Sequence, residues 1–408
     1  MQRKKNTSEK LWTKYFILTF IYSLFTSISN NMLLTGLPLY AIHLGGNNSI
    51  SGLLFGLFML FAIFSRPLFG KLIDEKSRRM VLITGGVISA ILSLSYVFAL
   101  SIGLLLLLRA FHGFGFGATT NSSGTVVSDI VPKSRLAEGI GYFGLANTLA
   151  TAVGPALSLF IIMNYNYNLL FIVSSILGFI ALFCSFFINY ERKNNESEHE
   201  LSNPKVKRKL SEIMYEKTAL PTGLVTIFIY VAMGATLTFI PIYALSLGIE
   251  DIGLYFTVYS FALLFTRIAG GKLADKYGYS LVIIPGMIMI VLSFVVLAYA
   301  TSLSAFIISA ILYGLGLGSV DPTLNAVMIR LCPPDRRGVG NSTFFTAKDL
   351  GGGLGAVIFG FVSLSQGFRS VYLYCALSII LAMIAYHFIL RRQISSMEKV
   401  VGGIKQSA

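Results

Sequence analysis

The sequence predicts an all-α integral membrane protein in which twelve transmembrane helices form two pseudo-symmetric six-helix bundles. Hydrophobic residues make up 55% of the 408-residue chain and charged residues only 12%, about half the charged share of a soluble domain. The apolar residues fall in runs long enough to cross a bilayer, which takes about 20 helical residues. The two halves of the chain also repeat the same motifs at a constant spacing. These three observations together define the fold class.

Each expected span is an apolar run bounded by polar or basic residues. Twelve such runs can be placed, at residues 12–37, 50–69, 80–99, 103–128, 138–162, 168–189, 220–246, 251–270, 281–300, 304–329, 339–364 and 369–390. Lys and Arg gather in every second connection, and the opposite side has almost none beyond Arg369. The positive-inside rule therefore predicts that both termini are cytoplasmic. We expect a multi-pass protein of a plasma membrane, and a bacterial one because the loops are compact.

The domain organisation follows from one long polar segment. Residues 190–218 are rich in both signs of charge and interrupt the apolar runs, which is typical of a solvated tether. We expect an N-terminal six-helix bundle over residues 1–189 and this linker on the cytoplasmic face. A C-terminal six-helix bundle with a short cytoplasmic tail would occupy residues 219–408.

An internal repeat is the most informative feature of the chain. Residues 70–74 (GKLID) match residues 271–275 (GKLAD), and Arg66 matches Arg267, both at an offset of 201 residues. The same offset relates several glycine pairs, namely Gly113 and Gly314, Gly115 and Gly316, Gly117 and Gly318, Gly139 and Gly340, and Gly154 and Gly355. Two similar bundles can enclose a cavity and expose it to either side in turn. The repeat therefore favours a secondary transporter, although it excludes neither a channel nor an enzyme.

Three motifs resemble the major facilitator superfamily, and within it the twelve-span drug:proton antiporters. The loop between the second and third spans reads GKLIDEKSRR over residues 70–79. In the fourth span, residues 109–113 read RAFHG, with His112 where the family has Gln. In the fifth span, small residues precede a Gly-Pro pair. They match the antiporter motif, with two of its glycines replaced by Ala and Ser. The resemblance covers nearly the whole chain.

The resemblance implies two structural roles. The Asp and the basic residues of the loop motif would pair with neighbours on the fourth and eleventh spans. These contacts would form a latch that closes the cytoplasmic side and breaks when the site opens inward; the latch residues are Gly70, Asp74, Arg78, Arg79 and Asp129. The antiporter motif would supply close helix packing through Gly141, Ala150, Gly154 and Pro155. The alternative for the basic loop residues is that they only fix the topology.

Charged side chains inside a span are costly and usually face a cavity or a partner. Asp321 lies near the middle of the tenth expected span, and Lys348 and Asp349 lie near mid-depth in the eleventh. We expect Asp321 or Asp349 to carry a proton, since partial desolvation raises a carboxyl pKa toward neutrality. The alternative is a fixed ion pair of Lys348 with either Asp. Lys348 and Asp349 point about 100° apart on a helix, so at most one of them lines the cavity squarely.

Other polar residues at membrane depth are weaker candidates for the site. Arg109 resembles the family's fourth-span arginine, which implies a role in proton relay or in organising the site. A free histidine titrates near neutral pH, so His112 could help the relay, or it makes a plain hydrogen bond. Asn30, Asn31 and Asn325 could contact substrate, although such groups more often join helices by hydrogen bonds.

The function that fits these features is proton-coupled export of small organic molecules by alternating access. Proton-coupled uptake of a nutrient or metallophore and a non-transporting membrane sensor remain alternatives. We expect no enzymatic activity, no cofactor and no metal site. The expected driving force is an ion gradient, and the expected ion is the proton. The expected partners are the lipid bilayer and a small-molecule substrate. No nucleic acid is expected, because the net charge of +14 is spread between apolar runs, and one chain suffices as a monomer.

Overall fold

The structure of the chain is a computed structural model. It describes residues 10–132, 135–190, 216–333 and 336–394. Within these ranges, the side chains of residues 74–75, 136–137, 268–277 and 337–338 lie outside the description. Most of the expected linker, residues 191–215, is therefore not described, and its predicted boundaries stay a prediction.

The described residues are almost entirely helical. The long helices are α1 (Lys14–His43), α2 (Asn48–Glu75), α3 (Arg78–Ser95), α4 (Ile102–Ile130), α5 (Leu136–Asn164), α6 (Tyr167–Phe186), α9 (Leu220–Ser246), α10 (Gly253–Tyr277), α11 (Ser280–Ala298), α12 (Leu303–Leu331) and α13 (Arg337–Ala385). Short helical turns are η1 (Tyr96–Phe98), η3 (Lys217–Ala219) and η5 (Tyr386–Leu390).

Ten helical segments in the described residues are long and apolar enough to cross a membrane. One of them, Val339–Ile394, is 56 residues long and contains two helices that meet at Gly367. Gly367 has φ 77°, a left-handed conformation that glycine adopts without strain. The eleventh and twelfth expected spans therefore lie on either side of Gly367. Helix α10, with 25 residues, packs against α5 and α12 but is not among the ten.

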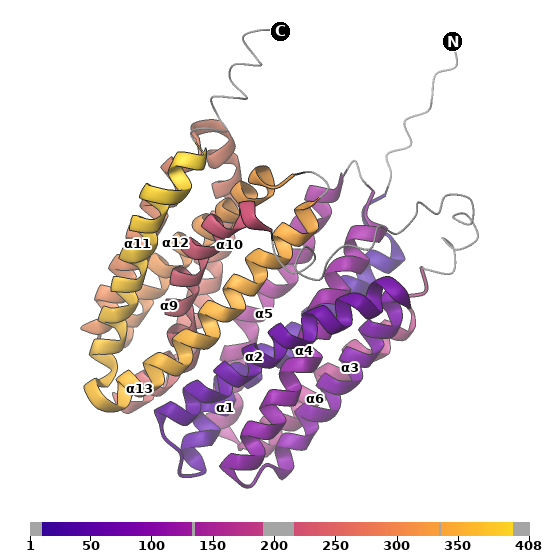
Figure 1. The fold of residues 1–408 in the computed structure, drawn as a ribbon. Helices are drawn as coiled ribbons and strands as arrows, with labels where there is room; N and C mark the ends of the chain where they lie inside the picture. The colour runs from indigo at the N-terminus through magenta and orange to yellow at the C-terminus, as the bar shows by residue number, and fades with distance from the viewer. Residues whose placement is uncertain (1–9, 133–134, 191–215, 334–335, 395–408) are drawn as a thin grey trace, which may run out of the picture.

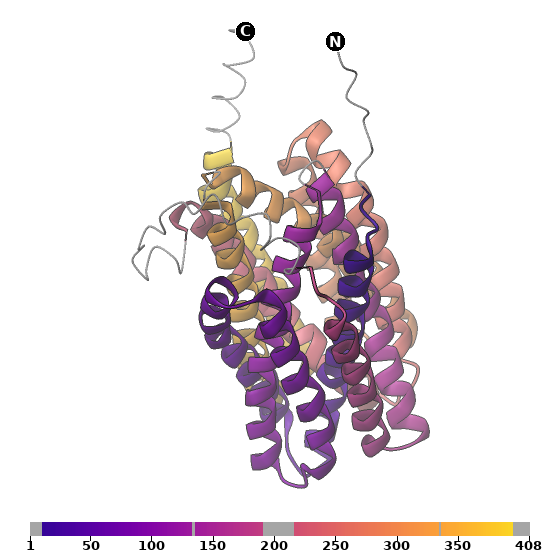
Figure 2. The ribbon, with the colours of Figure 1, turned by 90° about the vertical axis from the view of Figure 1, so that its right-hand side faces the viewer.

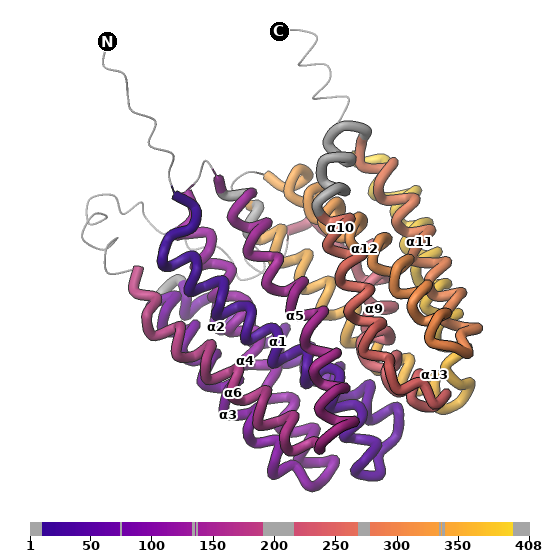
Figure 3. Tube along the Cα trace, turned by 180° about the vertical axis from the view of Figure 1, so that it is seen from behind, coloured from indigo at the N-terminus to yellow at the C-terminus, as the bar shows by residue number. Residues whose placement is uncertain are grey.

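Helices α1–α6 and helices α9–α13 form two groups that lie side by side (Figure 1), and the view from behind shows the same division (Figure 3). The groups meet mainly where α2 packs against α13 and α5 packs against α10. The start of α1 and the last described residues lie at the same end of the molecule (Figure 2). An even number of crossings accounts for this arrangement.

The packing of the glycines reproduces the sequence repeat. A Cβ on Gly113 would overlap the carbonyl oxygen of Phe58, and a Cβ on Gly314 would overlap that of Tyr259, which stands 201 residues after Phe58. Gly117 and Gly318 likewise face α2 and α10 at equivalent positions. These glycines let backbones approach closely, as small residues do in membrane helix pairs. The two halves are therefore built alike.

The end of the molecule away from the termini is closed by contacts between the halves. The start of α2 touches α13 there, where Gly52 lies against Ala356 and Gly360 lies against Asn48. A Cβ on Gly52 would overlap the Ala356 carbonyl oxygen. The two helices thus leave no room for a side chain between them at this end.

The entry to the second half is fixed by a buried glutamate. Glu216 is 4% exposed, and its Oε2 lies 2.6 Å from Arg336 Nε in an ion pair. Its other oxygen accepts a hydrogen bond from the hydroxyl of Thr218, and its backbone N–H donates to Thr343. These bonds hold the segment before α9 to the ends of α12 and α13.

Candidate functional site

Five charged side chains meet where the two halves face each other. They come from four helices: Arg66 from α2, Arg267 from α10, Asp321 from α12, and Lys348 and Asp349 from α13. Two hydrogen-bonding neighbours, Tyr230 on α9 and Thr148 on α5, complete the group. We call these seven residues the charged cluster. It contains three cations and two carboxylates.

Lys348 and Asp321 form an ion pair inside the second half. Lys348 Nζ lies 2.6 Å from Asp321 Oδ1, and both side chains are largely buried. The hydroxyl of Tyr230 donates to the same oxygen at 3.0 Å. The ammonium group also lies within 5.1 Å of the ring centroids of Tyr230, Phe344 and Phe345, close enough for cation–π attraction. The expected alternative, an ion pair of Lys348 with an Asp, is thus present.

Asp349 turns the other way and joins the two halves. Its Oδ2 accepts a hydrogen bond from Arg66 Nη2 at 2.6 Å, and the side chains are 11% and 18% exposed. Arg66 belongs to α2 of the first half, so this ion pair crosses the interface. The expected divergence of Lys348 and Asp349 is therefore confirmed, because one faces Asp321 and the other faces the opposite half.

A second arginine makes the equivalent contact between the halves, from the second half to the first. We call each of these two contacts a crossing. Arg267 Nη1 donates to Thr148 Oγ1 at 2.8 Å, while its Nη2 lies 3.7 Å from Asp321 Oδ2. Arg267 stands 201 residues after Arg66, and Asp349 stands 201 residues after Thr148. The two crossings are thus related by the repeat, but only one of them has a carboxylate as acceptor.

Sequence reasoning missed four members of this cluster. Arg66 and Arg267 were recognised only as markers of the repeat, and Tyr230 and Thr148 were not singled out. The signal for the arginines was present, because both are charged residues inside expected spans at equivalent positions. Tyr230 and Thr148 had no such signal among the many hydroxyls of the chain.

Arg109 and His112 lie apart from the charged cluster, inside the first half. Arg109 is 1% exposed and its guanidinium carbon lies 3.8 Å from the ring centroid of Phe58. Its Nη1 has no hydrogen-bond partner. His112 is also buried, and its Nδ1 lies 3.1 Å from the hydroxyl of Tyr96. The structure therefore separates these two candidates from Asp321 and Asp349.

A small polar cavity of about 30 Å³ lies among α1, α3, α4 and α6, which is room for about two waters. Its lining is mostly hydroxyl-bearing: Ser23, Thr26, Ser27, Ser29, Asn30, Ser89, His112, Phe116, Thr119, Thr120, Ser123 and Gly178. We call it the first-half cavity. Asn30 is 8% exposed, and its Oδ1 has no hydrogen-bond partner.

The other two asparagines have different surroundings. Asn31 donates from Nδ2 to the carbonyl oxygen of Ser27 at 2.8 Å, so it bonds within its own helix. Asn325 lies one turn after Asp321, and its Oδ1 has no partner. Of the three candidate asparagines, Asn30 and Asn325 thus have a side-chain oxygen without a hydrogen-bond partner.

The described contacts of the latch residues lie within the first half. Arg78 Nε lies 3.1 Å from Asp129 Oδ2 on α4, as expected for a fourth-span partner. Arg79 donates to the carbonyl oxygen of Phe186 at the end of α6. A Cβ on Gly70 would lie 3.6 Å from Asn121 Nδ2. The side chain of Asp74 lies outside the described residues, so its contact with the eleventh span stays a prediction.

The antiporter motif packs closely along only part of its length. A Cβ on Gly154 would lie 2.6 Å from the Asn31 Cβ on α1, and Ala150 and Pro155 are buried. Gly141 differs, because a Cβ there would meet no atom within 4 Å. The described surroundings of Gly141 thus show no close packing at this position, and its expected packing role stays a prediction.

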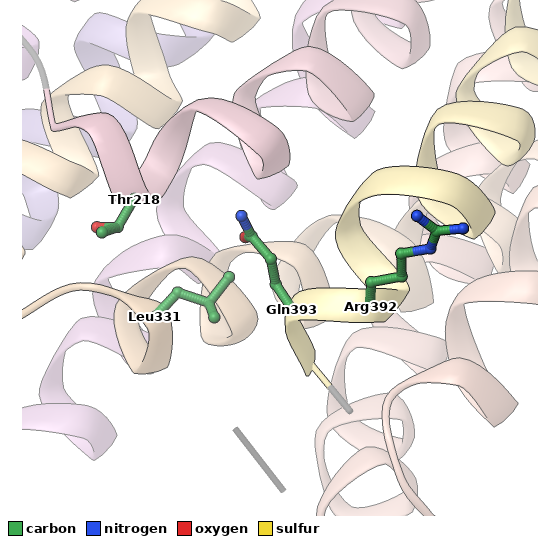
Figure 4. Close-up of a pocket in the computed structure, with 4 residues that line it drawn as sticks. All are labelled: Thr218, Leu331, Arg392 and Gln393. Atoms are coloured by element: carbon green, nitrogen blue, oxygen red, sulfur yellow. The ribbon is translucent and has the colours of Figure 1, made fainter. Parts of the chain in front are cut away.

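A larger pocket lies away from the charged cluster. It has a volume of about 320 Å³ and lies between η3, the end of α12 and the last described helical turn. Figure 4 shows its four lining residues, Thr218, Leu331, Arg392 and Gln393. None of the intramembrane candidates lines it. In the part of the chain that the structure describes, no group of three or more His, Cys, Asp or Glu side chains is arranged to hold a metal ion.

Comparisons with known proteins agree with this architecture. The chain is 28% identical to the staphylopine export protein of Staphylococcus aureus, over 90% of this chain and 94% of that protein. It is 25% identical to a multi-drug resistance efflux pump PmrA homolog of Lactococcus lactis, over 96% of this chain and 99% of the relative. A crystal structure of a POT family transporter in complex with 5-aminolevulinic acid matches with a TM-score of 0.76 and 14% identity. The match covers 92% of this chain and 96% of the POT transporter chain. At this low identity it shows a shared fold only.

The family model for the Major Facilitator Superfamily matches residues 17–251 and again residues 222–403. These two matches together span nearly all the described helices. Members of this family are transporters rather than enzymes. The chain therefore belongs to the major facilitator superfamily and is a multi-pass membrane transporter of small molecules.

Proposed function

We propose that this transporter exports small organic molecules in exchange for protons, and that Asp349 is the residue that couples the two movements. The observation that carries the proposal is the Arg66–Asp349 ion pair, which joins α2 of the first half to α13 of the second at 2.6 Å. A proton on Asp349 removes its negative charge, so the ion pair becomes a weaker hydrogen bond from the Arg66 cation to a neutral carboxyl group. Protonation thus loosens a contact between the two moving bodies.

Because the two acceptors differ, we expect only one of the two crossings to respond to protons. Thr148, the counterpart of Asp349, does not titrate, so the Arg267–Thr148 contact is independent of pH. Asp321 is held by Lys348 and Tyr230 inside one half, and its protonation would not release the interface directly. We assign Asp321 to the substrate side of the site and Asp349 to coupling.

Export is the direction that the relatives support, because two of them are named as an export protein and an efflux pump. Proton-coupled uptake, the alternative, would require substrate and proton to move in the same direction. We further propose twelve spans, with α10 as the eighth, cytoplasmic termini, a plasma-membrane location and a functional monomer. We also propose a latch on the side that carries the termini, of which the Arg78–Asp129 ion pair is the fourth-span part.

Proton movement in proteoliposomes tests the proposal. A panel of cationic drugs and organic acids is added to liposomes holding an imposed proton gradient and an internal pH dye. We expect at least one compound to dissipate the gradient with the wild type, and Asp349→Asn to abolish this effect while still binding the compound. Proton movement that survives in Asp349→Asn and stops in Asp321→Asn would move the coupling role to Asp321.

A further inference from the structure

The charged cluster carries an excess of positive charge inside the membrane. Arg66 and Lys348 each have a carboxylate at 2.6 Å, so Asp349 and Asp321 are both occupied. Arg267 is left with a longer contact of 3.7 Å to an oxygen of Asp321, and 33% of its side chain is exposed. An unbalanced cation at this depth is costly unless an anion joins it. The cluster therefore offers a place for an anion and no free carboxylate for a cation.

The first half presents a neutral surface at the corresponding positions. By the offset of 201 residues, Thr120, Asn147 and Thr148 stand where Asp321, Lys348 and Asp349 stand in the second half. Ser27 stands where Tyr230 stands, at the offset of 203 residues that also relates Pro38 to Pro241. Ser27 and Thr120 both line the first-half cavity. This cavity is thus the uncharged counterpart of the pair that Tyr230 and Asp321 form.

The first-half cavity is rich in hydrogen-bond acceptors. Five of its hydroxyls donate their protons to backbone carbonyl oxygens, so the hydroxyl oxygens can act only as acceptors toward a ligand: Thr26, Ser29, Thr119, Thr120 and Ser123. The buried Asn30 Oδ1 is an acceptor with no partner, and burying such a group unpaired is unfavourable. Thr120 is exposed, so the cavity opens on one side. A volume of about 30 Å³ admits a small donor group rather than a ring.

We propose that the substrate is a small polar compound with a carboxylate and a separate N–H or O–H donor, bound across the two halves. The carboxylate binds Arg267 in the charged cluster, beside the Lys348–Asp321 ion pair, and the donor group enters the first-half cavity and bonds Asn30. This inference rests on the proposed transport function and names its substrate class. A lipophilic cation without a carboxylate finds no unpaired carboxylate among the described residues of the cluster.

Untargeted transport from a cell extract tests the substrate class without choosing a compound in advance. Inside-out and right-side-out membrane vesicles containing the full-length protein are given a proton gradient and the small-molecule fraction of the cells. Their contents are then compared by mass spectrometry with those of vesicles lacking the protein. We expect the accumulated compounds to carry a carboxylate and a hydrogen-bond donor. Accumulation of cations without a carboxylate would overturn the inference and leave transport standing.

Variants of Arg267 and Asn30 test which residue binds the carboxylate of the substrate and which binds its donor group. We expect Arg267→Gln to lower the accumulation at least about tenfold, the effect of losing roughly one charged hydrogen bond, and Arg267→Lys to restore part of it. Asn30→Leu should raise the KM of the same compound several-fold and leave its maximal rate largely unchanged. Methyl esterification of the compound should reduce its transport with wild type and not with Arg267→Gln. Gly103→Ala, a position with no neighbouring atoms, serves as the folded control.

Two results would separate the inference from the proposed function. If no compound accumulates in either vesicle orientation with folded protein, the transport proposal itself fails. If carboxylates accumulate equally with wild type and Arg267→Gln, the assignment of the anion site to the charged cluster fails.

Discussion

Thr148 and Asp349 occupy equivalent positions in the two halves, and each accepts a hydrogen bond from the equivalent arginine of the opposite half. The duplication that built the fold has therefore kept both crossings and given them different acceptors. A hydroxyl holds one crossing at every pH, while a carboxylate lets the other respond to protons. This difference is the physical basis of the coupling that we propose.

Replacing the hydroxyl with a carboxylate should make both crossings alike. In Thr148→Asp we expect Arg267 to gain a charge-assisted partner at the interface, stabilising this conformation by about 1–3 kcal/mol. The apparent melting temperature in detergent should rise at neutral pH, and transport should slow because the halves separate less readily. Thr148→Val is the matched control and should lower the melting temperature slightly. A melting temperature for Thr148→Asp at or below that of Thr148→Val would contradict the geometry.

The repeated glycines should be sensitive to a single methyl group. Gly113→Ala and Gly314→Ala each place a Cβ against a backbone carbonyl oxygen of the neighbouring helix, and such overpacking typically costs about 1–3 kcal/mol. We expect both variants to lose thermal stability, measured by size-exclusion chromatography after heating. Gly124→Ala in the same helix α4 meets no atom within 4 Å and should be as stable as wild type or more so. Equal stability of all three variants would mean that the helices are less closely packed than described.

The buried Glu216 should stabilise the entry to the second half. Glu216→Ala removes the carboxylate that pairs with Arg336 and accepts a hydrogen bond from the Thr218 hydroxyl, so we expect a loss of about 1–3 kcal/mol in the free energy of unfolding. Limited proteolysis should then cut faster just before α9. Glu216→Gln keeps the hydrogen-bond acceptor without the charge and should fall between the two. Proteolysis at the wild-type rate in Glu216→Ala would show that the packing of α9 alone fixes this segment.

The hydrogen bond from the Tyr230 hydroxyl to Asp321 should affect substrate affinity but should not be essential for proton coupling. Tyr230→Phe removes one hydrogen bond to Asp321 and leaves the ring beside Lys348. A bond to a charged group contributes about 1.5–3 kcal/mol, so we expect substrate affinity to change several-fold while proton coupling persists. Equilibrium binding of the transported compound measures this directly. Loss of coupling in Tyr230→Phe would place Asp321, rather than Asp349, at the centre of the mechanism.

The sequence predicted the helical membrane fold and its repeat because hydropathy and motif spacing are local signals. It also singled out Asp321, Lys348 and Asp349, since charge inside an apolar run is visible without coordinates. It did not predict which partners they have. The Arg66–Asp349 pair joins residues 283 positions apart, and no periodicity in one chain reveals such a contact. The Arg267–Thr148 crossing was harder still, because threonine is unremarkable inside a membrane helix.

The most direct test of the central claim measures how the two halves move when Asp349 is protonated. Spin labels are attached to Ser128→Cys and Ile329→Cys, which are equivalent exposed positions near the ends of α4 and α12. Double electron–electron resonance then measures the distance between the two labels. The half-buried native Cys184 is replaced by Ser. With wild type we expect the distance to lengthen as the pH falls from about 8 to about 5, because a proton on Asp349 weakens its bond to Arg66. Asp349→Asn should show the long distance at both pH values, and Asp321→Asn should still respond. A pH response in Asp349→Asn equal to that of wild type would contradict the account.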